Sequence, residues 1–403
     1  MKKISILSLL LVFALVFTGC TSNEMAIYNA FEKSQDITSM ESNTDVTFTV
    51  DVEGLSPEDQ QGFQQMQTMV KDSKVSLHQK MVQNKEKTAA TAQVDMNMNF
   101  GGMAMNFPIW VDTDMTGKTP KLVEIIKMPA MMKMGLPQEL QTKEYAVINF
   151  EEMMKDQKEK QDFANMMKFA QESQGKFATF FKDYVKNFDP GFTMVEKKGT
   201  KVIDGESLDI YELKLDDASF KKLVRYTGNS FMDNKDTMKF VKEYMDMVMT
   251  FSQATNPQAQ LDKAELNKGL AELEKNLPEM KKEFNKFMDQ YNNVKFIGDK
   301  GIVIEYGINK DGYIVHENGK IDLHIDMAAI EKVAAKVEKP QAKGIFNIGI
   351  NYNSKIYNIN KDVKVDMPKL TPQNSMSLTQ MMEAQAKMME TQIVQEQNIQ
   401  PAM

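Results

Sequence analysis

TAQVDMNMNFGGMAMNFPIWV, residues Thr91–Val111, is the clearest β-hairpin signal in the chain. Gly101 and Gly102 can supply the positive φ angles of a two-residue turn, and apolar and polar residues alternate on both sides of them. The pattern predicts a β-hairpin with three facing pairs: Phe100 and Met103, Met98 and Met105, Met96 and Phe107. Because successive side chains of a strand point to opposite faces, these six lie on one apolar face. The other face carries Asp95, Asn97, Asn99, Ala104 and Asn106.

The same period-two alternation occurs along most of the chain. Before the hairpin it includes Val46, Phe48, Val50 and Val52, and it resumes at Val75. After the hairpin it returns at residues 122–128, 145–150, 192–196, 208–215 and 302–325. A helix-like segment at residues 327–337 separates these from the last strands, at residues 346–367. Strands with one apolar and one polar face are typical of an antiparallel sheet that covers a core on one side only.

Two tracts change to the helical period. Residues 151–190 carry an aromatic stripe that includes Phe177, Phe180, Tyr184 and Phe188, and the spacing of these side chains predicts a helix that buries one face. Residues 216–292 carry similar stripes of Met, Val, Leu and Phe. We therefore expect two helical insertions, and the sequence leaves open whether the tract 216–292 folds as a subdomain of its own.

These patterns predict an α+β fold with an antiparallel sheet and helical insertions. Neither set of strands looks self-contained, so the strands before and after the insertions are expected to share one sheet. We place this domain at residues 20–370. A polar tail rich in Met and Gln follows at residues 371–403 and is expected to form at most a marginal helix.

The N-terminus resembles a bacterial lipoprotein signal peptide. Lys2 and Lys3 precede an apolar run of about 14 residues, which is too short for a comfortable membrane span. The run ends in Phe17-Thr18-Gly19-Cys20, where most lipoboxes have Leu in place of Phe17. We expect residues 1–19 to be cleaved and Cys20 to be acylated, which would anchor the protein at the extracytoplasmic face of the cell membrane. The alternative is an ordinary secretory signal with an incidental cysteine.

Composition excludes several function classes. Cys20 is the only cysteine, so a lipidated chain has no thiol for a disulfide, a zinc site or a nucleophile. The net charge changes from −7 to −9 when Lys2 and Lys3 leave with the leader, which disfavours nucleic acid as a partner. No motif of a hydrolase, metalloprotease or phosphate-binding loop is found, so we predict a protein that is not an enzyme and holds no cofactor or metal.

Three short phrases add a resemblance to a known superfamily. They are Ile37-Thr38-Ser39-Met40 after the first helix, Lys143-Glu144-Tyr145-Ala146-Val147-Ile148, and Val202-Ile203-Asp204-Gly205 followed by Tyr211-Glu212-Leu213-Lys214-Leu215. Together with the order of elements, they resemble the LolA, LolB and LprG/LppX-like lipid-carrying proteins. Germination-associated lipoproteins of spore-forming bacteria look like one branch, which implies a Gram-positive envelope. The resemblance implies that the antiparallel sheet is curved into an incomplete β-barrel, a half-barrel that wraps over helices and leaves an apolar cavity.

The hairpin face suggests what such a cavity would bind. Met side chains are flexible and fit irregular apolar shapes, and burial of each methylene of an acyl chain is worth about 0.8 kcal/mol. We predict a carrier or sensor that binds a lipid or another apolar ligand. The expected cavity wall is Met96, Met98, Phe100, Met103, Met105 and Phe107.

Two alternatives remain open from the residues alone. The six side chains could be ordinary core, which would leave an envelope protein that interacts with other proteins and has no ligand cavity. Less favoured is a Cu(I) site formed by Met96, Met98, Met103 and Met105, since clustered thioethers bind that ion. An acid–base or metal pair is not expected from His316 and His324, because a turn predicted at Asn318-Gly319 places them on opposite faces.

Overall fold

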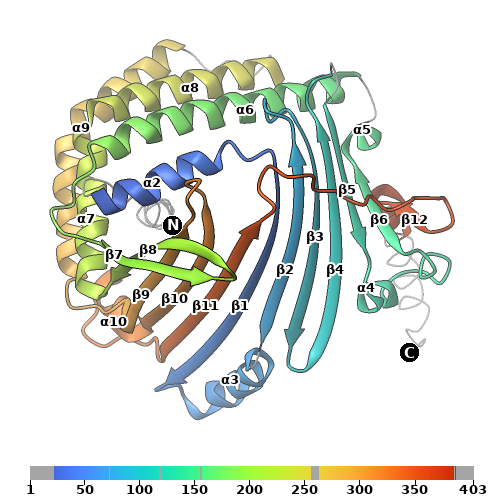
Figure 1. Ribbon diagram of the computed structural model, residues 1–403. Helices are drawn as coiled ribbons and strands as arrows, with labels where there is room; N and C mark the ends of the chain where they lie inside the picture. The colour runs from blue at the N-terminus through green and yellow to red at the C-terminus, as the bar shows by residue number, and fades with distance from the viewer. Residues whose placement is uncertain are drawn as a thin grey trace, which may run out of the picture.

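The computed structural model describes residues 22–71, 73–117, 120–154, 157–255, 263–384 and 386. Its centre is one sheet of 12 strands in the order β12-β6-β5-β4-β3-β2-β1-β11-β10-β9-β8-β7 (Figure 1). The strands are β1 Ser39–Glu53, β2 Lys74–Gln83, β3 Ala89–Phe100, β4 Met103–Asp114, β5 Lys121–Lys127, β6 Tyr145–Asn149, β7 Val195–Ile203, β8 Glu206–Leu215, β9 Ile297–Ile308, β10 Ile314–Asp326, β11 Ile345–Tyr357 and β12 Ser375–Ser377.

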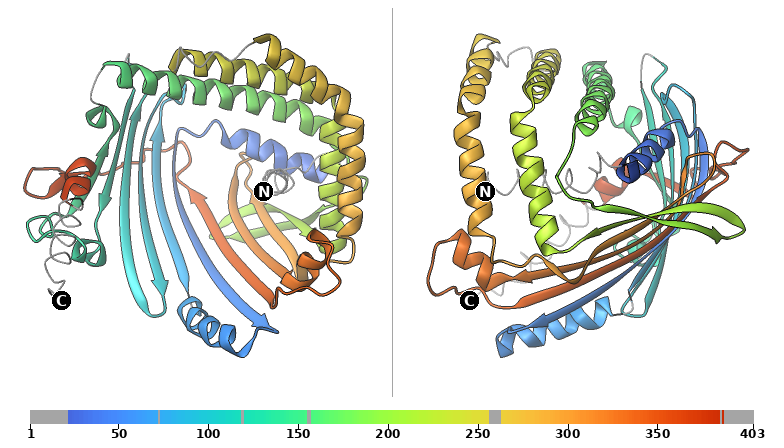
Figure 2. Two further views of the ribbon diagram at one scale, coloured as in Figure 1. Left: turned by 180° about the vertical axis from the view of Figure 1, so that it is seen from behind. Right: turned by 60° about the vertical axis from the view of Figure 1, so that its left-hand side comes forward.

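Nine helices accompany the sheet within the described residues, and most lie on its concave side (Figure 2). The helices are α2 Ser22–Ser34, α3 Pro57–Val70, α4 Ala130–Met134, α5 Phe150–Met153, α6 Gln157–Lys186, α7 Asp217–Asp233, α8 Lys235–Thr255, α9 Lys263–Gln290 and α10 Met327–Ala334. The sheet curls but keeps two edge strands, β12 and β7. The predicted α+β class and incomplete antiparallel barrel are confirmed.

One strand pair joins the two halves of the chain. β1 pairs with β11 in antiparallel register along its length, with Val46 opposite Tyr352 and Phe48 opposite Ile350. All neighbouring strands are antiparallel except β12 and β6. The strands on either side of the helical insertions therefore belong to one sheet, as the sequence predicts.

The hairpin of β3 and β4 has the predicted register. Its three facing pairs are Phe100 with Met103, Met98 with Met105, and Met96 with Phe107. Gly101 and Gly102 occupy the turn at φ +56° and +80°, a region that glycine adopts without steric cost. Met69 of α3 lies against this turn, because a Cβ on Gly101 would stand 3.3 Å from the Met69 Cα.

The main core lies where helices cover one end of the concave face. Ile27 and Ala30 of α2, Phe188 just after α6 and Leu223 of α7 pack there with residues of β8 and β9. The side chain of Asp216 caps α7, since its Oδ1 accepts the Ser219 N–H at 2.8 Å. The stripe on α6 is thus largely buried, and the tract 216–292 shares its core with the sheet.

α7 and α9 are also joined by polar contacts. The Arg225 Nη2 donates to the Asp289 Oδ1 at 2.6 Å. Asn229 and Asn285 exchange amide hydrogen bonds at 3.0 and 2.7 Å. Of the helices described, none is long and apolar enough to cross a membrane.

The predicted turn at Asn318-Gly319 is wrong. β10 runs without interruption from Ile314 to Asp326, and its turn with β9 lies at Gly312, φ +83°. His316 and His324 therefore share a face, eight residues apart, rather than lying on opposite faces. Gly319 serves another purpose: a Cβ there would stand 1.9 Å from the Tyr352 ring. The glycine makes room for an aromatic ring and does not form a turn.

The far edge of the sheet carries a small second core. Met128, Leu136 and Ala146 pack there with Met376 of β12. β12 begins after residue 370, so the first part of the predicted tail contributes a strand that pairs with β6. The methionines Met131, Met132 and Met134 belong to the short helix α4. Cys20 and residues 387–403 lie outside the described residues.

Candidate functional site

The concave face of the sheet has two regions that differ in cover. Over β8, β9 and the start of β10, helices α2, α6 and α7 bury the apolar side chains. Ile302, Leu213 and Leu215 are each 3% exposed or less. We call this part the packed region.

The second region continues the same face across β11, β1, β2, β3 and β4. Cross-strand partners of an antiparallel sheet share a face, so the register carries the face from Ile350 to Phe48 and from Val75 to Met98. Its apolar side chains are all half-buried. We call this set the open floor: Val46, Phe48, Val50, Val75, Leu77, Met96, Met98, Phe100, Met105, Phe107, Ile348 and Ile350.

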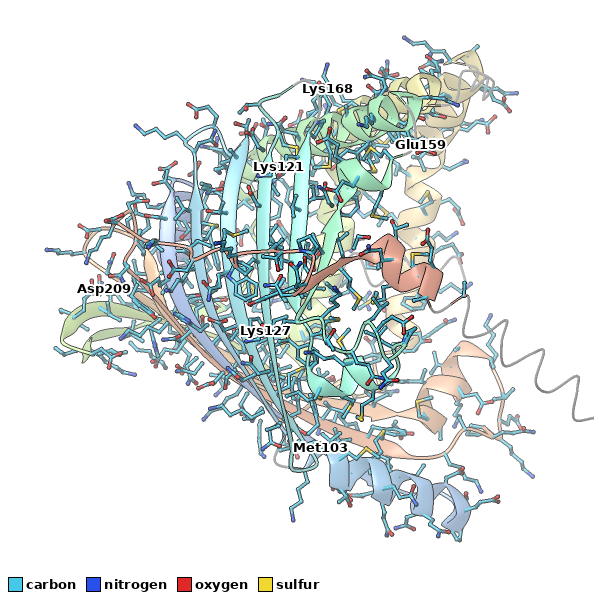
Figure 3. The ribbon with its side chains drawn as sticks, turned by 90° about the vertical axis from the view of Figure 1, so that its right-hand side faces the viewer. Met103, Lys121, Lys127, Glu159, Lys168 and Asp209 are labelled. Atoms are coloured by element: carbon cyan, nitrogen blue, oxygen red, sulfur yellow. The ribbon has the colours of Figure 1, made fainter. Side chains whose placement is uncertain are left out.

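The six residues predicted as a cavity wall lie on this face together. Five of them are half-buried members of the open floor. Met103 is 53% exposed at the tip of the hairpin, where Figure 3 shows it beside α3 and far from Glu159 and Lys168 of α6. Met66 and Met69 of α3 are 47% and 55% exposed. Met66, Met69 and Met103 form an apolar rim at this end of the floor, which we call the methionine rim.

α3 covers the floor only at its end. Phe63 is 9% exposed and packs edge-on against Phe346 of β11, with ring centroids 6.2 Å apart. Gln67 donates its side-chain N–H to the Val50 carbonyl at 3.2 Å. These contacts fix α3 beside the hairpin turn and hold the methionine rim in place.

A polar group stands where the open floor meets the packed region. Glu317 of β10 lies opposite Tyr306 of β9 and Ser354 of β11, so its side chain belongs to the concave face. The Ser354 hydroxyl is hydrogen-bonded to the Thr44 hydroxyl, with the two oxygens 2.8 Å apart. Burial raises the pKa of the Glu317 carboxyl. Burial, followed by the nearby Glu317, raises the pKa of Tyr352 to about 12.

The sequence alone does not identify Glu317 as a residue of the concave face. The Asn318-Gly319 pair was interpreted as a turn, which placed Glu317 at the end of a strand. The available signal was the alternation of Ile321, Leu323 and Ile325, which extends backwards through Gly319 to Glu317 when the strand is continuous.

The opposite, convex face holds a separate recess of about 300 Å³ near the β7–β8 hairpin. Asp204 and Lys355 both line it and are 2.7 Å apart as an ion pair. His316 also lines this recess, while its neighbour Glu317 faces the other side of the sheet. The recess and the open floor are therefore different surfaces.

Within the described ranges, no three His, Cys, Asp or Glu side chains are grouped to hold a metal ion. Met98 and Met105 are direct cross-strand partners, with Met96 and Met103 on the same face. The thioethers considered for Cu(I) are thus brought together, in a floor shared with Phe100 and Phe107.

The first helix is held firmly close to the predicted lipidation site. Glu24 is 2% exposed, and its Oε1 accepts the Met194 and Val195 backbone N–H groups at 3.1 Å each. Asn23 donates its side-chain amide N–H to the Val195 carbonyl at 3.2 Å. α2 begins at Ser22, two positions after Cys20 in the sequence.

Comparison with known proteins assigns this chain to no family. No family model matches the chain, and no curated protein matches it. The crystal structure of the Mycobacterium tuberculosis lipoprotein LppX is 11% identical, with a TM-score of 0.25 over 85% of this chain and 97% of that one. A DUF1329 family protein from Desulfovibrio piger is 9% identical, with a TM-score of 0.18 over 86% of this chain and 96% of that one. Likenesses this distant carry no functional argument.

Proposed function

We propose that the protein binds a lipid or another apolar ligand on the open floor and acts as a carrier or sensor. One observation supports this proposal above the others. The open floor is a continuous apolar face from β4 to β11 whose side chains are half-buried, although the same face is fully buried under helices over β8 and β9.

The physical case rests on the surface that remains in contact with water. An apolar ligand that covers the floor would gain about 25 cal/mol for each Å² of apolar surface removed from water. Met96, Met98 and Met105 can adapt to chains of different shape because the Met side chain has three rotatable bonds. The floor is therefore suited to a flexible ligand such as an acyl chain.

We propose further that Cys20 is acylated and anchors the protein at the extracytoplasmic face of the membrane. The support is the sequence around the leader and the short distance along the chain from Cys20 to α2. Mass spectrometry of the mature protein tests the anchor: acylation adds diacylglycerol to an N-terminal Cys20, and Cys20→Ser abolishes it. A mature N-terminus at another residue contradicts it.

A binding assay tests the ligand proposal. The mature chain, residues 20–403 with Cys20→Ser, is titrated with a fluorescent fatty acid, and the same titration is made on the double variant Met98→Gln, Met105→Gln. These two changes keep the length of the side chains but make the centre of the floor polar. We expect the variant to bind at least about tenfold more weakly.

A matched control uses Met134, which is 72% exposed on α4 and lies outside the floor. Met134→Gln should bind the probe as the unaltered chain does. If the unaltered chain takes up no probe, or if all three proteins bind it equally, the open floor is not a ligand site.

Protein binding is the second candidate, favoured by exposed methionines at the far edge. Met131, Met132 and Met134 of α4 are 49%, 44% and 72% exposed. Flexible methionines suit surfaces that accept variable protein partners. Crosslinking on intact cells from a photoreactive residue at position 132 tests it, with position 103 as the comparison. Crosslinks to protein from 132 alone would favour an interaction surface separate from the floor.

Copper binding is distinguished by a titration with Cu(I) under reducing conditions. Thioether ligation at the floor predicts that Met98→Gln, Met105→Gln lowers the affinity for Cu(I), whereas a lipid site predicts no specific uptake of the ion.

A further inference from the structure

The register of the sheet places the Glu317 carboxyl group among uncharged side chains on the concave face. Glu317 is opposite Tyr306 on one side and Ser354 on the other, and Thr44 follows Ser354 across β1. Phe31 of α2 packs edge-on against Tyr306, with ring centroids 5.8 Å apart, and is 39% exposed. The carboxyl group therefore sits at the junction of the open floor, the packed region and α2.

Glu317 has no hydrogen bond and no ion pair among the described residues. Its polar neighbours on the same face already have other partners, since the hydroxyls of Ser354 and Thr44 bind each other at 2.8 Å. Burial alone raises the pKa of the carboxyl, so no basic side chain compensates its charge. A half-buried carboxyl without a partner is costly, because the ion has lost part of its water and gained nothing in return.

The two tyrosines make this environment selective. Tyr306 is 6% exposed and Tyr352 is half-buried, and the charge of Glu317 contributes to raising the pKa of both phenols. An anion placed here would meet a carboxylate and no counter-charge. An ammonium group would supply the missing positive charge and three N–H donors, and aromatic faces attract cations.

We propose that Glu317, Tyr306 and Tyr352 form a head-group subsite of the open floor and that the ligand selected there is an amphiphile with an amino head group. This inference rests on the proposed function: the apolar chain of the ligand lies on the open floor, and its amine pairs with the Glu317 carboxylate. The methionine rim lies at the hairpin end of the floor, away from this subsite.

Three amphiphiles of equal chain length test the proposal: dodecylammonium, dodecanol and dodecyl sulfate, each below its micelle concentration. Their binding to the mature chain with Cys20→Ser is measured by calorimetry at about pH 8, where an amine is still protonated. We expect dodecylammonium to bind at least about tenfold more tightly than dodecanol, and dodecyl sulfate to bind most weakly.

Glu317→Gln should remove the preference for dodecylammonium and leave the affinity for dodecanol unchanged. The matched control is Glu305→Gln on β9, whose carboxylate lies on the convex face and pairs with Lys201 at 2.7 Å. That variant should keep the preference.

The outcomes distinguish the head-group subsite from the apolar ligand site on the open floor. Equal binding of dodecylammonium and dodecanol by the unaltered chain, or a preference that survives Glu317→Gln, overturns the head-group subsite and leaves the apolar site standing. Failure of all three amphiphiles to bind overturns both. The comparison of probes on the unaltered chain decides the question even where a variant fails to fold.

Discussion

The packed region and the open floor are two parts of one face of one sheet, and their sequences have the same alternation. Ile302, Ile304 and Tyr306 of β9 are buried, whereas Met96, Met98 and Phe100 of β3 are half-buried. The difference comes from the helices, because α2, α6 and α7 supply side chains to the core over β8 and β9. The alternation of apolar and polar residues predicts which face of the sheet is apolar. Whether that face becomes core or stays available for binding depends on the helices that pack over it.

The largest effect is expected from a truncation in the packed region. Phe188, two residues after the end of α6, is 0% exposed and contacts Tyr226 edge-on, with ring centroids 4.9 Å apart. Phe188→Ala should lower the free energy of unfolding by about 3–5 kcal/mol, because it leaves a cavity that the core cannot close. Urea denaturation followed by circular dichroism measures the change. A loss below about 1 kcal/mol would show that the region is not tightly packed.

Gly319 tests the continuity of β10, on which the placement of Glu317 depends. A methyl group at this position would overlap the Tyr352 ring. Gly319→Ala should therefore lower the free energy of unfolding by about 1–3 kcal/mol. In the double variant with Tyr352→Leu the penalty should shrink. An additive pair of effects would mean that the ring does not lie over Gly319.

Truncation in the open floor is expected to cost less. Met98→Ala removes a side chain that is only half-buried, so its loss should lower the free energy of unfolding by less than about 1.5 kcal/mol. The same change should weaken the binding of an apolar probe. A cost comparable to that of Phe188→Ala would place Met98 in a filled core and remove the contrast between the two regions.

The smallest effect, with the clearest sign, concerns Glu317 and pH. Its pKa is raised by burial, so the folded state resists ionisation of this carboxyl. Stability linked to the protonated form is complete below the unfolded pKa and is lost as pH rises through the folded pKa. Glu317→Gln should therefore be more stable than the unaltered chain at neutral pH and equal to it at about pH 4.

Thermal melts across that pH range measure the difference. Tyr306 and Tyr352 are the titratable groups that face Glu317 in the sheet, and both titrate well above this window. A difference that does not change with pH would assign the effect of Glu317→Gln to packing.

Local signals in the sequence predicted part of this structure well. The Gly101-Gly102 pair and the alternation around it gave the hairpin register without error, since a two-residue turn leaves only one pairing. Asp204-Gly205 is a similar local signal, because Asp and Gly tolerate positive φ, and the two residues form the β7–β8 turn with φ +51° and +83°. In both cases the residues that determine the geometry are neighbours in the chain.

Other features depend on contacts between distant residues. β1 and β11 pair although they are about 300 residues apart in the chain, and no local signal in the sequence predicts this pairing. Gly319 gives the same signal as a turn glycine, although its role is to accommodate Tyr352. For the same reason the sequence could identify the apolar face of the hairpin but not Glu317, nor which part of the face the helices leave open.

The measurement that tests this account most directly is mass spectrometry of organic extracts from the mature chain, residues 20–403 with Cys20→Ser, purified from the envelope fraction of cells that export it. The account predicts an apolar amphiphile in stoichiometric amount, lost when Met98 and Met105 are replaced by Gln and retained when Met134 is replaced. A chain that carries no such molecule and takes up none when amphiphiles are offered would contradict it, and would make the open floor part of an ordinary protein surface.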